Sequence, residues 1–166
     1  MTPEQIKLVQ DTFAKVGPIS GKAAELFYGR LFEIAPQVRA MFPNDMTEQR
    51  KKLMATLAIV VNGLGDLPAI LPAASALAKR HVGYGAQAAH YPVVGAALLW
   101  TLEKGLGDAW APPVAAAWAQ AYTTLSTFAV ETVALVERSR RGAAALNVAL
   151  SAVLGLGAAA LGLWVG

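Results

Sequence analysis

The chain contains no cysteine and only two histidines, His81 and His90, among its 166 residues. The missing cysteines exclude disulfides, iron–sulfur clusters, thiolate zinc sites, and c-type haem, whose attachment needs a Cys-x-x-Cys-His motif. They leave the redox compartment open, because a chain without cysteine is compatible with any. Two histidines leave very few ways to hold a transition metal, so the first question is whether either of them does.

Charge is also scarce. Asp, Glu, Lys and Arg make up 15% of the residues, the hydrophobic fraction is 55%, and the mean hydropathy is +0.44. This composition is more apolar than that of an ordinary soluble domain, and it indicates either a large cofactor pocket or a membrane segment. The net charge of +3 does not form a broad basic stripe, so the sequence argues against a nucleic-acid partner.

Strand-like alternation is missing as well, and periodic apolar residues divided by Pro and Gly predict a succession of helices. Thr2 is the expected cap of the first helix, with Gln5 completing a capping box. Asp45 is an expected helix cap, and Gly107 an expected helix end. The N-terminus lacks the basic-then-apolar layout of a secretory signal. The predicted helices cover residues 3–16, 20–35, 36–41, 46–63, 68–83, 92–106 and 112–140.

The last 25 residues, 142–166, carry no charge. As a helix they would span about 37 Å at roughly 1.5 Å per residue, enough to cross a hydrocarbon core of about 30 Å. The preceding "RSRR" follows the positive-inside pattern, and Trp164 suits the far interface. We therefore expect a single-pass membrane anchor that keeps the preceding domain in the cytoplasm. The alternative is an apolar helix folded onto that domain.

Small or polar residues recur at every fourth position of this segment, which would allow another helix to approach closely and form a dimer. They are Ala143, Asn147, Ser151, Gly155 and Ala159. The predicted organisation is thus a helical domain over residues 1–136, a basic juxtamembrane segment over 137–141, and a membrane anchor over 142–166.

Four motifs, in their order and spacing, resemble the globin family: "LFYGRLFEIAPQVRAMF", "RHVGYG", "HYPVVGAALLWTLEKGLGDAW" and "AWAQAY". The chain is similar to bacterial single-domain haemoglobins and to the globin half of flavohaemoglobins, over about residues 1–136. The resemblance implies an all-α globin fold, a three-over-three helical sandwich. It also implies non-covalent haem b as the cofactor, with dioxygen and other gases such as nitric oxide or carbon monoxide as ligands.

By the same resemblance, His81 corresponds to the proximal histidine that binds haem iron. Haem iron needs one neutral imidazole presented from a rigid element in an apolar cleft. Leu77 lies one turn earlier on the same helical face, and Gly83 and Gly85 are expected to end the helix. His90 lies nine residues further on, a spacing that suits neither a second ligand on one helix face nor an axial pair. We expect His90 to be a surface or capping histidine.

Two aromatic residues also match family positions. Phe42 corresponds to the phenylalanine that wedges against the porphyrin, although an ordinary core role would differ little from this. Tyr91 corresponds to the tyrosine that packs near the proximal histidine.

On the opposite side of the haem, Tyr28 matches a tyrosine that points at bound ligand and Gln49 matches a distal glutamine, with Leu53 on the same helical face as Gln49. Dioxygen on ferrous haem carries partial negative charge, which a phenol and an amide can stabilise by about 1.5–3 kcal/mol. Glutamine does not ligate iron as histidine does, so an open sixth position is expected. Lys52 and Arg80 could pair with haem propionates, or could equally be solvated helix charges.

The sequence departs from flavohaemoglobins at one position. Their last helix supplies a glutamate to a network with the tyrosine and the proximal histidine, and an ungapped count from Tyr91 puts Val133 there. Glu131 is two residues away, about 200° around a helix. The leading functional hypothesis is a membrane-tethered globin that reversibly binds dioxygen for storage, delivery or gas scavenging. The alternatives are a nitric oxide dioxygenase that uses a separate reductase, since no reductase domain is expected after the globin, and a haem-based sensor.

Overall fold

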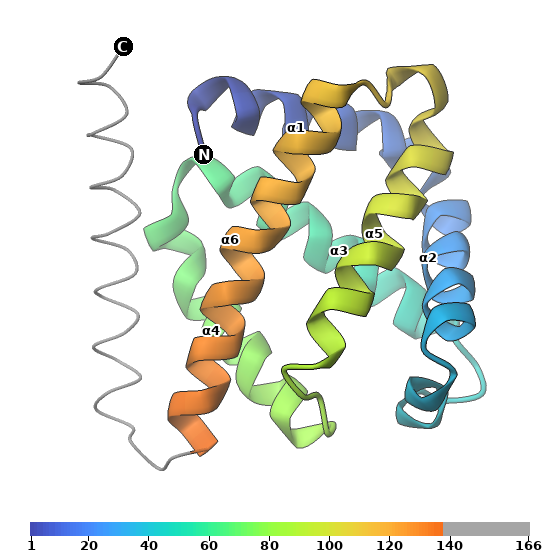
Figure 1. Cartoon of the computed structure of the whole chain (residues 1–166), viewed down its shortest axis with the longest axis vertical. Helices are drawn as coiled ribbons and strands as arrows, with labels where there is room; N and C mark the ends of the chain where they lie inside the picture. The colour runs from blue at the N-terminus through green and yellow to red at the C-terminus, as the bar shows by residue number, and fades with distance from the viewer. Residues whose placement is uncertain (138–166) are drawn as a thin grey trace.

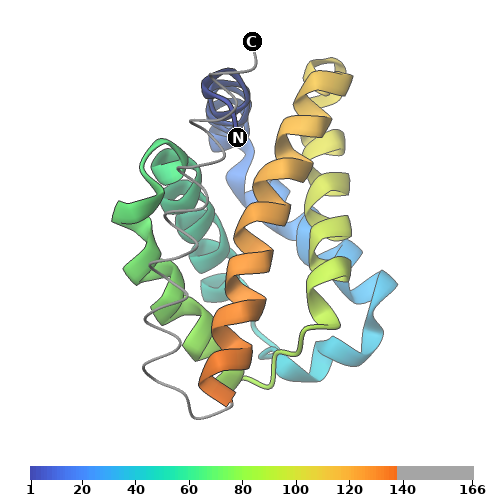
Figure 2. The same cartoon turned by 60° about the vertical axis from the view of Figure 1, so that its left-hand side comes forward.

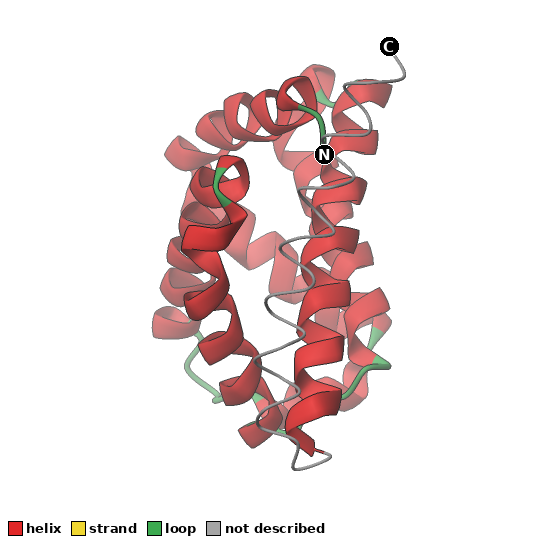
Figure 3. Cartoon of the chain, turned by 90° about the vertical axis from the view of Figure 1, so that its left-hand side faces the viewer, coloured by secondary structure: helices red, strands yellow, loops and turns green. Residues whose placement is uncertain are grey.

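The computed structural model describes residues 1–137, and all of its regular elements in that range are helical (Figure 3). The helices are α1 (Pro3–Val16), α2 (Ser20–Ile34), α3 (Thr47–Asn62), α4 (Leu67–Gly83), α5 (His90–Leu106) and α6 (Pro112–Glu137). Short 3-10 helices lie between them: η1 (Gly17–Ile19), η2 (Pro36–Met41), η3 (Gly63–Gly65) and η4 (Gly107–Ala109). The predicted ranges agree to within one or two residues up to residue 137, and residues 138–140 of the last prediction lie outside the described part.

The helices form two layers, as Figures 1 and 2 show. The helix α2 packs against α5, α6 packs against α5, and this layer is crossed by α1, α3 and α4. Apolar side chains from all six helices are buried where the helices pack against one another. The core residues along these contacts include Val9, Leu31, Ala97 and Trp118, each at most 3% exposed.

The first helix shows the expected capping box. The Thr2 side chain accepts from the Gln5 main-chain N–H, while the Gln5 side chain accepts from the Thr2 N–H. Further along α1, the Thr12 hydroxyl donates to the carbonyl of Leu8 and accepts from the Trp118 indole N–H of α6 at 3.0 Å. This buried pair fixes the position of α6, because an indole N–H left unpaired in the core would be costly.

Two of the predicted boundary signals differ in their outcome. Gly107 ends α5 with a φ of 51°, a left-handed conformation that glycine adopts without steric cost. The prediction that Asp45 caps α3 is wrong, because Met46 occupies the cap position. The Asp45 carboxylate instead accepts from the Thr47 N–H at 2.9 Å, one residue too early to serve as the cap.

The predicted anchor, residues 142–166, lies outside the described residues. Within residues 1–137, no helix combines the length and the apolar character needed to cross a bilayer.

Candidate haem site

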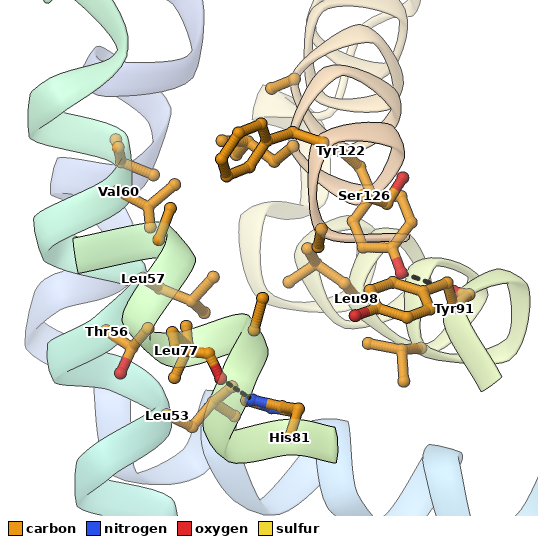
Figure 4. A pocket seen from close by; sticks show the side chains of 18 of the residues that line it. Leu53, Thr56, Leu57, Val60, Leu77, His81, Tyr91, Leu98, Tyr122 and Ser126 are labelled. Atoms are coloured by element: carbon orange, nitrogen blue, oxygen red, sulfur yellow. Dashed lines mark hydrogen bonds between the residues drawn. The ribbon is translucent and has the colours of Figure 1, made fainter. Parts of the chain in front are cut away.

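A cavity of about 270 Å³ lies between the helix layers. In Figure 4, side chains of α3 and α4 face those of α5 and α6 across it. The labelled apolar residues on its walls are Leu53, Leu57, Val60, Leu77 and Leu98. Among the described residues, the polar groups that line it belong to Thr56, His81, His90, Tyr91, Trp118, Tyr122 and Ser126. A slot of this kind suits a flat apolar ligand held by a few polar contacts.

His81 occupies the last turn of α4 and lines this cavity. Its Nδ1 atom lies 2.8 Å from the main-chain oxygen of Leu77, which can only accept. We therefore assign the proton to Nδ1, which leaves Nε2 with a free lone pair. This is the tautomer that a metal-binding imidazole requires, with its other nitrogen anchored by a carbonyl.

The turn after His81 is tightly closed. The N–H groups of Tyr84 and Ala86 both donate to the His81 carbonyl, at 3.1 and 3.0 Å. Between them, Gly85 has a φ of 82°, where a side chain would be strained. The helix ends at Gly83, as the glycines predicted, and the imidazole is presented from a rigid helix end.

Tyr91, in the first turn of α5, lines the same cavity. No hydrogen bond joins it to His81 among the described residues. Its main-chain oxygen accepts from the Tyr122 hydroxyl of α6, and the Tyr122 ring packs directly on Gly95, where an added Cβ would lie 2.5 Å from Tyr122 Cε1. Burial, with a contribution from Tyr91, raises the pKa of Tyr122 to about 12. The contacts of Tyr122 with Tyr91 and Gly95 thus join α6 to α5 beside the cavity.

His90 is the first residue of α5, after the cap position Ala89, and its Nδ1 accepts from the Gln87 N–H at 3.1 Å in the preceding turn. It is half-buried and also lies on the cavity wall, a position that the sequence analysis did not anticipate. With Nδ1 acting as the acceptor, the neutral ring carries its proton on Nε2. This histidine is thus a hydrogen-bond donor toward its surroundings.

Tyr28 and Gln49 are brought together, as the resemblance implied. The Tyr28 hydroxyl donates to the main-chain oxygen of Gln49 at 3.5 Å, and the Tyr28 ring is 4% exposed. Burial raises the pKa of the Tyr28 phenol, so it stays protonated and able to donate. Neither residue, however, is among those that line the cavity. Their sequence neighbour Phe27 and the α3 residue Leu53 do line it.

The remaining predicted site residues also lie off the cavity wall. Phe42 is half-buried in an aromatic cluster, edge-on to Tyr28 at 5.5 Å and to Phe32 at 5.4 Å. Lys52 and Arg80 are exposed, and neither forms an ion pair among the described residues. They flank Leu53 and His81 in sequence, both of which line the cavity.

Glu131 is exposed, and the side chain of Val133 is outside the described part.

Tyr122 and Thr56 line the cavity, although neither is predicted as a site residue from the sequence. A signal for each was present. Tyr122 follows Trp118 by four residues and Thr56 follows Leu53 by three, so each shares a helix face with another lining residue. The approach of Tyr122 to Gly95 could not be read from the sequence, because it depends on how closely α5 and α6 cross.

The globin family model matches residues 25–129, more than half of the chain. The chain belongs to the globin family. Membership implies haem binding, and the cavity fits that cofactor on chemical grounds. It offers apolar walls and the His81 imidazole with Nε2 free to bind iron, and the chain has no cysteine to supply a thiolate. The residues that would hold haem are His81 at the iron and the leucines of α3, α4 and α5 around the ring.

The curated relatives are flavohemoproteins. This globin is 28% identical to that of Rhodopirellula baltica over 129 residues, 76% of this chain and 32% of that protein. It is 34% identical to that of Xylella fastidiosa over 125 residues, 73% of this chain and 31% of that protein. The chain thus spans about a third of the length of these relatives.

Two solved structures share the fold. A bacterial globin from Campylobacter jejuni superposes with a TM-score of 0.74, covers 82% of this chain and 99% of its own, and is 24% identical. An engineered carbene transferase, provisionally named a nitric oxide dioxygenase from Rhodothermus marinus, gives a TM-score of 0.75 at 25% identity. That superposition covers 84% of this chain and 97% of the other.

Proposed function

We propose that this globin holds non-covalent haem b through His81 and reversibly binds dioxygen, for storage, delivery or gas scavenging. The observation that carries the proposal is the hydrogen bond from His81 Nδ1 to the Leu77 carbonyl. It fixes the tautomer that can bind iron, on a residue that lines an almost wholly apolar cavity. Haem supplies, when bound, a ferrous iron with an open position for a gas.

The partner of His81 also favours gas binding over peroxide chemistry. A carboxylate that accepts from the proximal imidazole increases electron donation to iron, whereas a neutral carbonyl does so less. The described partner of His81 is the Leu77 carbonyl. Weak donation suits a protein that binds and releases its ligand unchanged.

For the distal side we propose that Tyr28 and Gln49 stabilise the bound gas by donating hydrogen bonds. Their support is their proximity, with the Tyr28 hydroxyl 3.5 Å from the Gln49 main-chain oxygen, and the raised pKa that keeps Tyr28 protonated. Such a role requires the Tyr28 hydroxyl to leave the Gln49 carbonyl when the cavity is filled. The hydrogen bond from Tyr28 to Gln49 is long at 3.5 Å and therefore weak, so breaking it requires little free energy.

The test is the absorption spectrum of the purified chain with added haem, followed by exposure to dioxygen and removal of it. The proposal predicts an intense Soret band and a spectrum that cycles between two forms without oxidation. A chain that binds no haem, or whose iron oxidises at once in air, would contradict it.

The alternative function is nitric oxide dioxygenation, in which nitric oxide and dioxygen combine to nitrate with one electron from a separate reductase. The flavohemoprotein relatives and the Rhodothermus protein support it. Sustained nitric oxide consumption by the globin with membranes and NADH, lost in His81→Ala, would establish it. Reversible dioxygen binding with no such turnover under any reductant would return the globin to a binding role.

We further propose that residues 142–166 tether the globin to the cytoplasmic face of a membrane. The support is the uncharged stretch of 25 residues that follows "RSRR" in the sequence. The full chain should then float with lipid vesicles and require detergent for extraction. A version that ends at Arg141 should stay in the aqueous fraction and still load with haem. Equal solubility of the two without detergent would refute the tether.

A further inference from the structure

Three segments meet at one end of the molecule. They are the C-terminal end of α6 at Glu137, the C-terminal end of α4, and the connection between α4 and α5. All three lie at the lower end in Figures 1, 2 and 3, which are turned about the same vertical axis. We call Arg80 and residues 84–89, which form this end, the turn face.

The chain beyond α6 starts beside the turn face. From Glu137 to Gly142 it can reach at most about 17 Å when fully extended, at roughly 3.5 Å per residue. The 26 residues of α6 place its other end about 39 Å away. A bilayer that holds residues 142–166 therefore lies within about 17 Å of Glu137, the end of α6 beside the turn face.

The turn face has the chemistry of a membrane interface. Tyr84 is 65% exposed, more than any other large hydrophobic side chain among the residues that the structure describes. Arg80 is exposed and has no ion-pair partner among the described side chains. Tyrosine and arginine are the side chains that favour the headgroup level, one by its amphipathic ring and the other by its charge.

Acidic residues, which an anionic lipid surface would repel, are absent from positions 80 to 102, the stretch that contains the turn face. Arg80 is the sole charged residue from position 80 to position 102. The exposed residues after Tyr84 include Gln87, Ala88 and Ala89, which are uncharged. The short segment 137–141 that follows α6 adds three arginines against one glutamate. Both segments thus match a lipid surface in sign and polarity.

We propose that the turn face rests on the lipid headgroups of the bilayer that holds residues 142–166. This rests on the tether proposed above. His81 and Ala86 both lie at this end and line the cavity. The proposed orientation therefore places this side of the cavity next to the lipid, where apolar gases such as dioxygen and nitric oxide dissolve better than in water.

The absence of cysteine makes the test direct, since one introduced thiol is the sole reactive one. Four variants of the full-length, haem-loaded chain each carry one cysteine at an exposed position: Tyr84→Cys and Ala88→Cys on the turn face, Ile59→Cys on α3, and Ile19→Cys in η1. Ile19 packs near Gly105, at the other end of α5 from the turn face. Each variant is bound to vesicles of neutral and anionic phospholipid and treated with a water-soluble maleimide. The rate at which its thiol reacts is divided by the rate for the same variant unfolded in urea.

We expect the turn-face thiols to react about tenfold or more slowly than those at positions 19 and 59, because lipid headgroups cover them. Equal normalised rates at all four positions in protein that floats with the vesicles would overturn the proposed orientation and leave the tether intact. Protein that does not float would overturn both. Haem absorbance shows whether each variant is folded. Two positions on the turn face are used so that the result does not depend on a single substitution.

Discussion

The imidazole of His81 is held by the main-chain oxygen of Leu77, one turn earlier on α4, at 2.8 Å from Nδ1. The bond lies within a single helix, so it forms as soon as α4 forms and does not depend on the rest of the cavity. It leaves Nε2 unprotonated next to the leucine walls of α3 and α4. The iron-binding tautomer is thus a property of local helix geometry.

Replacing His81 with Ala should abolish stable haem binding and leave the helices in place, because His81 is exposed and contributes little to the core. Haem titration followed by the Soret band, with far-ultraviolet circular dichroism for the fold, measures both. His90→Ala is the matched control, since it also removes one cavity imidazole. It should retain haem, and equal loss of haem in both variants would contradict the assignment.

Tyr28→Phe should speed dioxygen release by about 10- to 100-fold, which corresponds to the loss of roughly 1.5–3 kcal/mol from a hydrogen bond to a partly charged oxygen. Stopped-flow displacement of dioxygen by carbon monoxide gives the rate. Tyr122→Phe removes a hydroxyl from the cavity wall on the α6 side and is the control, expected within about twofold of wild type. If the rate is unchanged in Tyr28→Phe, Tyr28 is a core residue only.

Gly95→Ala should destabilise the fold by about 1–3 kcal/mol, because the added methyl would lie 2.5 Å from Tyr122 Cε1. Thermal or urea unfolding of the haem-loaded protein measures the change. In a Tyr122→Leu background the same substitution should lower the free energy of unfolding by much less. Equal costs in the two backgrounds would show that Gly95 and Tyr122 do not pack as described.

Tyr122 should also make the fold sensitive to alkali. Its pKa is raised to about 12 from an ordinary 10.0. Between those values the folded chain keeps a proton that the unfolded chain releases, so the tyrosine's contribution to stability is complete below about pH 10 and falls as the pH rises toward 12. Burial also raises the pKa of Tyr28 and of Tyr91, so tyrosinate absorbance should show a late phase that Tyr122→Phe reduces. Titration of all four tyrosines in one phase would argue against its burial.

Much of the fold could be predicted from the sequence, since helix ends depend on local signals. The Thr2–Gln5 box and Gly107 are both confirmed. Asp45 failed as a cap because its carboxylate reaches the Thr47 N–H one residue early, a difference in loop geometry that residue identity does not encode.

The site was less predictable than the fold. His81 lines the cavity as expected, because its role depends on one helix end. Tyr28, Gln49 and Phe42 were predicted from the resemblance alone, and none of them is among the described residues that line the cavity. Instead, Tyr28 packs edge-on against Phe42 and donates to the Gln49 main-chain oxygen. Where such side chains point depends on what fills the cavity and on how α2 meets α3. Neither can be read from spacing along the chain.

The most direct test of the account is the visible absorption spectrum of the reduced, haem-loaded protein without added gas. The account predicts the single broad visible band of five-coordinate ferrous haem with one histidine ligand, which disappears in His81→Ala and persists in His90→Ala. Sharp, split visible bands of a six-coordinate, bis-histidyl iron would contradict it, because both histidines would then be ligands and no position would remain for a gas.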